Sequence, residues 1–231
     1  IMARARAADP AMGYAVDFVA VTMKRLIKEI ARQKIKVVTN AGGVNPSACA
    51  AAVRKIAADA GVNLKIVAVL GDDLLARAAE FRAAGMKEMY TGEPLPAKLM
   101  SMNAYLGAVP IAAALAEGAD VVITGRAVDS AITLGPLMHE FGWRADDLDR
   151  MAAGSLAGHI IECGAQATGG LFTDWEAVPG WDNIGYPVIE CRADGSFVVT
   201  KPPGTGGIVT RGTVSEQLVH EIGDPQAYML P

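Results

Sequence analysis

The chain has 231 residues, of which 52% are hydrophobic and 20% are charged, and its formal net charge is −4. This length allows one large α/β domain, or one domain with a small appendage, to bury a sizeable core. The acidic balance argues against a nucleic-acid-binding protein, which needs a basic face. The longest wholly apolar run, residues 108–116, is too short to span a bilayer. With no basic-then-apolar leader in view, we expect a cytoplasmic protein without membrane contact.

Helices and strands are expected to alternate through the first part of the chain. β-Branched runs predict strands and apolar residues at helical spacing predict helices. The strands are expected at 35–40, 64–70 and 120–125, and the helices at 14–33, 47–61, 71–85, 103–119 and 126–142. Alternation at this spacing predicts an α/β fold, in which an open, mostly parallel sheet is flanked by helices.

The later part of the chain has a different pattern, and we place a soft boundary near Trp143. Residues 1–143 form the doubly-wound α/β part, and residues 144–231 an α+β part with glycine-rich loops, although one domain could contain both. One long helix or two short ones are expected over 143–164. A β-hairpin is expected around Ala193-Asp194-Gly195, and a last helix over 213–223.

Three loops follow the predicted strands, and in an open parallel sheet ligands bind beyond the carboxyl ends of the strands. The first loop carries Asn40, Asn45 and Ser47 at a helix start, where backbone N–H groups favour an anion. The third carries Arg126, which suits bidentate capture of a carboxylate or phosphate. Asn and Ser residues are also common in turns and helix caps, so Arg126 is the most informative of the four.

Carboxylates in the same loops are candidates for proton transfer. Asp72 follows the second predicted strand and Asp129 follows the third. Aspartate is equally common in ordinary turns. The sequence therefore predicts two candidate acid–base residues and leaves the turn interpretation open for both.

The stretch HIIECGAQATGG, residues 159–170, concentrates polar groups at the end of a predicted helix. His159 and Glu162 can share one helix face at a spacing of three, and Glu162, next to apolar residues, needs a partner. Gln166 and Thr168 then form a polar exit that suits close approach of a ligand. A packed helix with a glycine exit remains the alternative. One His–Glu pair offers too few ligands for a metal, so no metal site is predicted.

No cofactor motif is present. The loop after the first strand has neither GK[ST] nor GxGxxG, and the GTGG segment around Gly206 follows a hairpin rather than a first βα turn. We therefore predict no dinucleotide or ATP site and leave the cofactor open. Gly206 is retained as a candidate substrate-binding position because its backbone can approach a ligand closely.

Four phrases together resemble the acyclic terpene utilisation protein AtuA family: VVTNAGGVNPSACA, VVITGRAVDSAITLGPLMHEFGW, GHIIECGAQATGG and KPPGTGGIVTRGTVSEQLVHEIGDPQAYMLP. The resemblance covers about residues 9–231. It implies bacterial breakdown of acyclic terpenes and related branched acids as CoA thioesters, alongside acyl-CoA carboxylases, hydratases and dehydrogenases. Members of the family usually begin with a further strand and glycine-rich turn and continue past the LP that closes this chain. No catalytic residue carries over from the family.

The leading hypothesis is an enzyme of branched or isoprenoid acid catabolism that acts on an acyl-CoA or carboxylate by lyase, hydratase or isomerase chemistry. A second hypothesis is a non-catalytic partner or assembly subunit of the same pathway, with Trp175 and Trp181 as anchors. A third is a metal-dependent hydrolase. The expected partners are a small-molecule acid or acyl-CoA, other enzymes of the pathway and further copies of the chain as a homo-oligomer.

Overall fold

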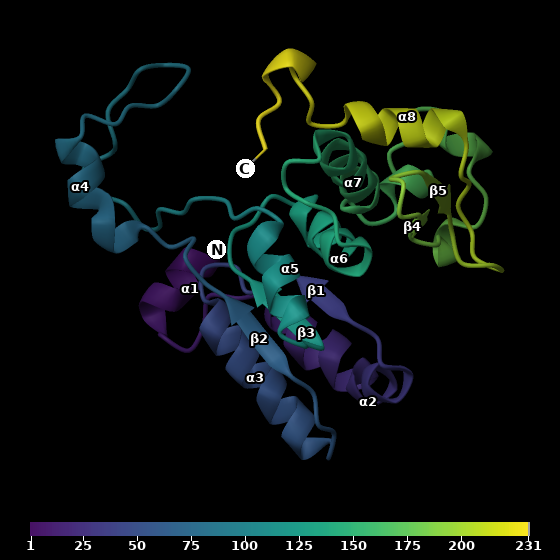
Figure 1. Ribbon diagram of the computed structural model, residues 1–231, viewed down its shortest axis with the longest axis horizontal. Coiled ribbons are helices and arrows are strands. Elements are labelled where there is room, and N and C mark those ends of the chain that lie inside the picture. The colour runs from purple at the N-terminus through teal and green to yellow at the C-terminus, as the bar shows by residue number, and fades with distance from the viewer. Residues whose placement is uncertain (231) are drawn as a thin grey trace. The chain divides into compact units, whose positions relative to one another are not determined.

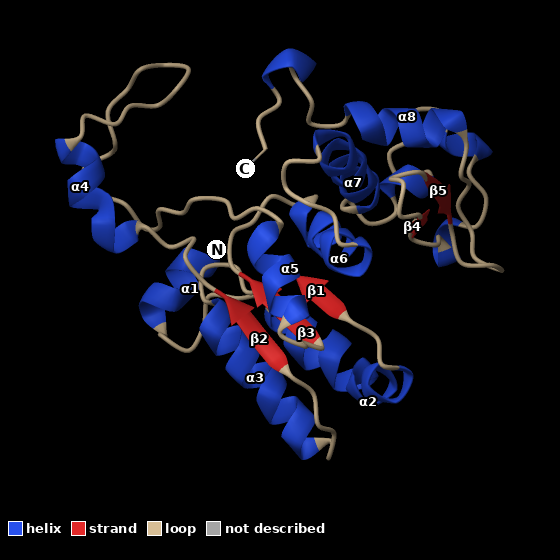
Figure 2. Cartoon of the chain, viewed as in Figure 1, coloured by secondary structure: helices blue, strands red, loops and turns tan. Residues whose placement is uncertain are grey.

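The computed structural model describes residues 1–230, and its elements are drawn in Figures 1 and 2. The residues fall into two compact units. The first unit contains residues 1–106 and 113–127, and the second contains residues 107–112 and 128–230. The domain boundary near Trp143 stays a prediction.

The first unit is built on a three-stranded parallel sheet. Its strands are β1 (Val37–Thr39), β2 (Ile66–Val69) and β3 (Val121–Thr124), in the order β1-β3-β2. All four residues of the central strand β3 are 0% exposed, which explains why its sequence is uninterrupted by charge. With the antiparallel hairpin of the second unit, this sheet confirms the predicted fold class.

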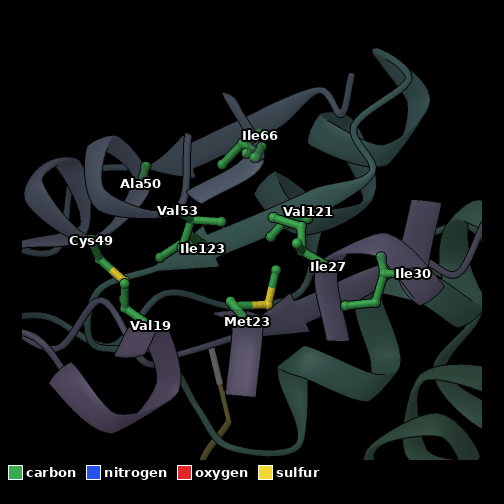
Figure 3. Packing of buried hydrophobic residues seen from close by; sticks show 11 residues of the cluster. Val19, Met23, Ile27, Ile30, Cys49, Ala50, Val53, Ile66, Val121 and Ile123 are labelled. Carbon is green, nitrogen blue, oxygen red and sulfur yellow. The ribbon is translucent and has the colours of Figure 1, made fainter. Parts of the chain in front are cut away.

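The core of the first unit lies between the sheet and two helical segments (Figure 3). The first is the π-helix η1 (Phe18–Met23) continued by α2 (Lys24–Gln33), and the second is α3 (Pro46–Asp59). Their buried side chains pack with those of β2 and β3: Val19, Met23, Ile27, Ile30, Cys49, Ala50, Val53, Ala57, Ile66, Val121 and Ile123. Val122 points to the opposite face of β3 and is also fully buried, so both faces of this strand are covered.

Asn45 fixes the start of α3. Its side-chain oxygen accepts the N–H of Ala48 at 3.3 Å, and its amide nitrogen donates to the carbonyls of Pro10 and Met12 at 2.9 and 2.8 Å. Asn45 is therefore the N-cap of α3, whereas Ser47 is exposed within the helix.

Replacing Asn45 by alanine is expected to lower the free energy of unfolding by about 1–2 kcal/mol, because the cap acceptor and both long-range donors are lost. Ser47→Ala is the matched control two residues away. It should change stability by less than about 0.5 kcal/mol. Urea denaturation of the two variants measures the difference, and equal stabilities would contradict the assigned cap.

The connection from β2 to β3 departs from the prediction. Residues 71–85 form only the short η2 (Leu75–Arg77) and α4 (Ala78–Ala83), and an irregular segment follows. The helix expected over 103–119 is confirmed only for α5 (Val109–Ala116). Pro110 lies in its first turn, where the missing N–H costs nothing, so the helix begins there and residues 103–108 are not helical.

The second unit contains α6 (Ala131–Phe141), α7 (Leu148–Ile161) and α8 (Arg211–Val219), with a hairpin of β4 (Val188–Cys191) and β5 (Phe197–Thr200). The hairpin is confirmed, and one helix rather than two occupies 148–161. The indole N–H of Trp143 donates to the carbonyl of Ala193 at 2.9 Å and so holds the hairpin turn.

Short 3-10 turns join these elements: η3 (Gln166–Thr168), η4 (Trp175–Ala177), η5 (Trp181–Asn183) and η6 (Pro225–Ala227). The first unit begins with the short helix α1 (Met2–Ala8). None of the helices within residues 1–230 is long and apolar enough to cross a membrane.

Candidate functional site

Asp72 lies buried at the carboxyl end of β2, with 2% of its surface exposed. Its Oδ2 accepts the backbone N–H of Arg126 at 2.9 Å and the side-chain N–H of Asn103 at 2.9 Å. The carboxylate thus joins the loops that follow β2 and β3. An ideal Cβ at Gly125 would lie 2.5 Å from both carboxylate oxygens, so this turn needs glycine. This geometry makes Asp72 a brace for the turn, and its role in proton transfer stays a prediction.

Arg126 leaves the end of β3 with its side chain half-buried. Its Nη2 donates to the hydroxyl of Tyr105 at 2.6 Å, and its guanidinium carbon lies 4.8 Å from the centre of the same ring. The tyrosine and the braced backbone together orient the guanidinium. A planar cation held in this way suits a carboxylate or phosphate.

The remaining loop residues of the first unit have mixed placements. Asn45 is committed to the cap of α3 and Ser47 is exposed on that helix, while Asn40 is half-buried directly after β1. Gly42, in the same loop, has no room for a side chain, since an ideal Cβ would lie 2.3 Å from the carbonyl oxygen of Thr124. The loop therefore packs tightly against the end of β3, and its predicted anion contacts stay a prediction.

In the second unit, His159 and Glu162 form a buried pair at the end of α7. The Nδ1 of His159 lies 3.1 Å from Oε1 of Glu162, and its Nε2 lies 3.2 Å from the carbonyl oxygen of Leu218 on α8. The side chains of the pair are 6% and 10% exposed. The sequence prediction that these two residues share one helix face is realised in this contact.

The partners of the imidazole determine where its protons lie. A carbonyl oxygen only accepts hydrogen bonds, so Nε2 of His159 carries a proton. The contact between Nδ1 of His159 and Oε1 of Glu162 is a hydrogen bond only if a further proton lies between them, and either of these two atoms can carry it. Burial, followed by the negative charges of Asp129 and Glu221, raises the pKa of Glu162, while His159 lowers it. The pair therefore holds one transferable proton in a water-poor position.

Gln217 and Cys163 complete the surroundings of this pair. Gln217 is fully buried on α8, and its Nε2 donates to the carbonyl of His159 at 2.8 Å. Its Oε1 has no hydrogen-bond partner among the described residues, and the same holds for Oε1 of Gln166. Burial raises the pKa of the Cys163 thiol, which disfavours a thiolate nucleophile. Sequence reasoning missed Gln217, because a contact 58 residues away leaves no local signal.

An apolar cavity of about 230 Å³ adjoins the His159 ring. Its walls are formed by α7, the end of α8 and the segment that follows it: Ala152, Ser155, Leu156, His159, Leu218, Ile222, Tyr228 and Leu230. The ring of Tyr228 meets that of His159 edge-on at 6.3 Å between centres. A cavity of this size and lining has room for a small apolar group.

The other predicted residues of the second unit have structural placements. The hydroxyl of Thr168 is buried between the carbonyl oxygens of Ala165 and Gly185, at 2.9 and 2.5 Å. Gly206 packs directly on Gly180, where an ideal Cβ would lie 1.9 Å from the Gly180 oxygen. Asp129 is exposed just before α6. Substrate contacts of these residues stay predictions.

The raised pKa of Glu162 predicts a pH-dependent stability. Because the folded state holds this proton more tightly than the unfolded state, the contribution is complete at acidic pH and declines as pH rises through the folded pKa. The decline amounts to about 1.4 kcal/mol for each pKa unit. Glu162→Gln should therefore gain stability relative to the wild type as pH rises above the usual titration range of a glutamate carboxyl. Urea denaturation at a series of pH values, from acidic to neutral, tests it.

Glu140→Gln supplies the control, because Glu140 is exposed on α6. Its stability curve should run parallel to that of the wild type. A parallel curve for Glu162→Gln as well would show that the carboxylate is not held in a proton-retaining environment.

Nothing in the described residues resembles a ready-made metal centre: no group of three or more His, Cys, Asp or Glu side chains is placed to hold an ion. Comparisons with curated proteins and with solved structures gave no match. The model of the family described as "Acyclic terpene utilisation family protein AtuA" matches residues 1–231, which agrees with the phrases around Arg126 and His159. The chain therefore belongs to the AtuA family of acyclic terpene utilisation proteins.

Proposed function

We propose that the protein is a catabolic enzyme that moves a proton on a branched or isoprenoid acyl-CoA or carboxylate, as a lyase, hydratase or isomerase does. The observation that carries this proposal is the buried His159–Glu162 pair at an apolar cavity of about 230 Å³. An acid–base pair needs a transferable proton near neutral pH, and raising the pKa of a carboxyl group by burial is a general way to obtain one.

The chemistry assigns different tasks to the residues. The apolar walls bind the hydrocarbon chain. The ring of His159 lines the cavity and passes the proton between the substrate and Glu162, which lies behind it. Separately, Arg126 of the first unit is a candidate for binding a carboxylate or phosphate group. Asp72 keeps the Arg126 backbone in place and acts as a positioning residue. A cytoplasmic location is part of the same proposal.

The first test is a thermal-shift screen of the full chain against branched acyl-CoAs and the corresponding free acids. Binding stabilises the folded state by about 2.7 kcal/mol at a hundredfold excess of ligand over Kd, so a substrate raises Tm measurably. Arg126→Ala tests the anion contact by itself and should reduce the shift with an acyl-CoA. Arg144→Ala removes an exposed arginine whose partner is Asp146 and should leave the shift intact. An unchanged Tm across the whole panel would contradict the proposal.

A second candidate function is a binding partner of another enzyme of the pathway. Trp175 and Trp181 favour it, since they are 59% and 45% exposed and exposed tryptophans are frequent anchors of protein interfaces. Co-purification with an acyl-CoA carboxylase that is lost in Trp175→Ala/Trp181→Ala, together with full function of Glu162→Gln in cells, would favour this candidate over the enzyme.

A further inference from the structure

Residues 75–100, here called the arm, extend from the first unit, and their two ends, Leu75 and Met100, line a pocket beside α1. Among them only Ala78 is buried. The arm is nonetheless organised: Arg82 donates to the carbonyls of Pro96 and Ala97 at 2.7 and 3.0 Å, and Lys87 pairs with Pro94 near the tip. Figure 1 shows α4 and the loop beyond it standing apart from the sheet of the same unit.

The tip of the arm exposes apolar side chains. Met86, Met89 and Tyr90 are 43%, 65% and 85% exposed. Ordering a segment of this length costs backbone and side-chain entropy that only burial can offset, and an isolated two-stranded hairpin is marginal in water. Methionine and tyrosine are also enriched at protein interfaces. The arm therefore needs a surface to cover it.

An apolar groove of about 520 Å³ lies in the same unit between η1 and α3. Its floor consists of small and aliphatic residues, and its rim carries charges: Val19, Ala20, Ala52, Ile56 and Ala60 below, and Lys24, Lys55 and Asp59 above. Val19 and Ala20 belong to the π-helical turn, and such turns occur frequently at functional sites.

We propose that a second copy of this chain covers the arm, with the arm of each protomer seated in the groove of the other. The charges favour this pairing: the tip carries Glu88 and Glu93 against Lys87. At the rim, Lys55 is paired with Asp59 at 3.0 Å, which leaves Lys24 to face the tip. Met89 and Tyr90 enter the apolar floor. Every copy has both an arm and a groove. In a dimer with twofold symmetry, each arm therefore fills the groove of the other protomer, and both surfaces are covered.

The test measures the dimer dissociation constant of the full chain by sedimentation equilibrium. Met89→Lys places a cation against the lysine rim and should weaken the dimer at least tenfold. The matched control is Leu148→Lys, which changes an apolar residue that is 74% exposed outside the arm and groove. It should leave the dimer unchanged. Circular dichroism melts confirm that each variant is folded.

A charge-reversal experiment distinguishes this contact from a dimer formed through another surface. Lys24→Glu should weaken the dimer, and adding Glu93→Lys to the same chain should restore it. A monomeric wild type at every concentration would overturn the proposal. So would a dimer that neither Met89→Lys nor Lys24→Glu weakens, because its interface would then lie elsewhere.

Discussion

Glu162→Gln is expected to slow proton exchange on a branched acyl-CoA or acid by about 10²–10⁴-fold, the usual contribution of a positioned acid–base group. Glutamine has the shape of glutamate and can donate to Nδ1 of His159, so the pair keeps its geometry. It cannot exchange a proton with the substrate through His159. Deuterium incorporation from D₂O, followed by mass spectrometry of the substrate at saturating concentration, measures the rate.

Two comparisons make this result specific. Glu140→Gln makes the same chemical change at an exposed position of α6 and should exchange at the wild-type rate. His159→Gln removes the proton-sharing ring and should also lower the rate. A wild-type rate in Glu162→Gln, with the substrate still raising Tm, would place the proton chemistry on another residue.

The sheet was predictable from sequence because its strands are short apolar runs bounded by turns. Val121–Thr124 is wholly buried, and a β-branched run of this kind has few other stable placements. The hairpin was equally predictable, since Gly195 has a φ of +91° that its turn requires. The start of α5 was not, because periodicity continues upstream of Pro110 although the helix does not.

The contacts of the candidate site differ in the sequence separation of the residues that make them. His159 and Glu162 are three residues apart, so helical geometry alone brings them together. The carbonyl of Leu218 and the amide of Gln217 reach the same histidine from 59 and 58 residues away. Only the packing of α8 on α7 creates these contacts, and no sequence pattern within either helix predicts them.

The arm shows a third feature of the structure that sequence periodicity does not predict. Apolar residues at helical spacing predict a helix over 71–85, of which the structure forms an α-helix only at 78–83. A crossover helix normally packs on its own sheet. Here the apolar side chains of the connection remain exposed. Periodicity identifies an apolar face, but it does not identify the surface that covers this face. Only the structure distinguishes an internal crossover from a segment that needs another partner.

Asp72→Ala is expected to lower the free energy of unfolding by about 3 kcal/mol, because it leaves the Arg126 N–H and the Asn103 amide without an acceptor in a buried position. Gly125→Ala should cost about 1–3 kcal/mol by overpacking, since its Cβ would lie 2.5 Å from both oxygens of Asp72. Removing the carboxylate also removes this clash. The double variant should therefore be no less stable than Asp72→Ala alone, and urea denaturation of the four proteins measures the coupling.

Gly42→Ala provides the contrast that tests the cause. Its Cβ would meet the backbone oxygen of Thr124 at 2.3 Å, which no side-chain replacement can remove. Its cost should therefore add to that of Asp72→Ala, whereas the cost of Gly125→Ala should vanish in the same background. The contrary result is that the losses of unfolding free energy of both glycine variants add to that of Asp72→Ala. The carboxylate would then not be the group that excludes a side chain at Gly125, and its assignment as the brace of the Arg126 turn would fail.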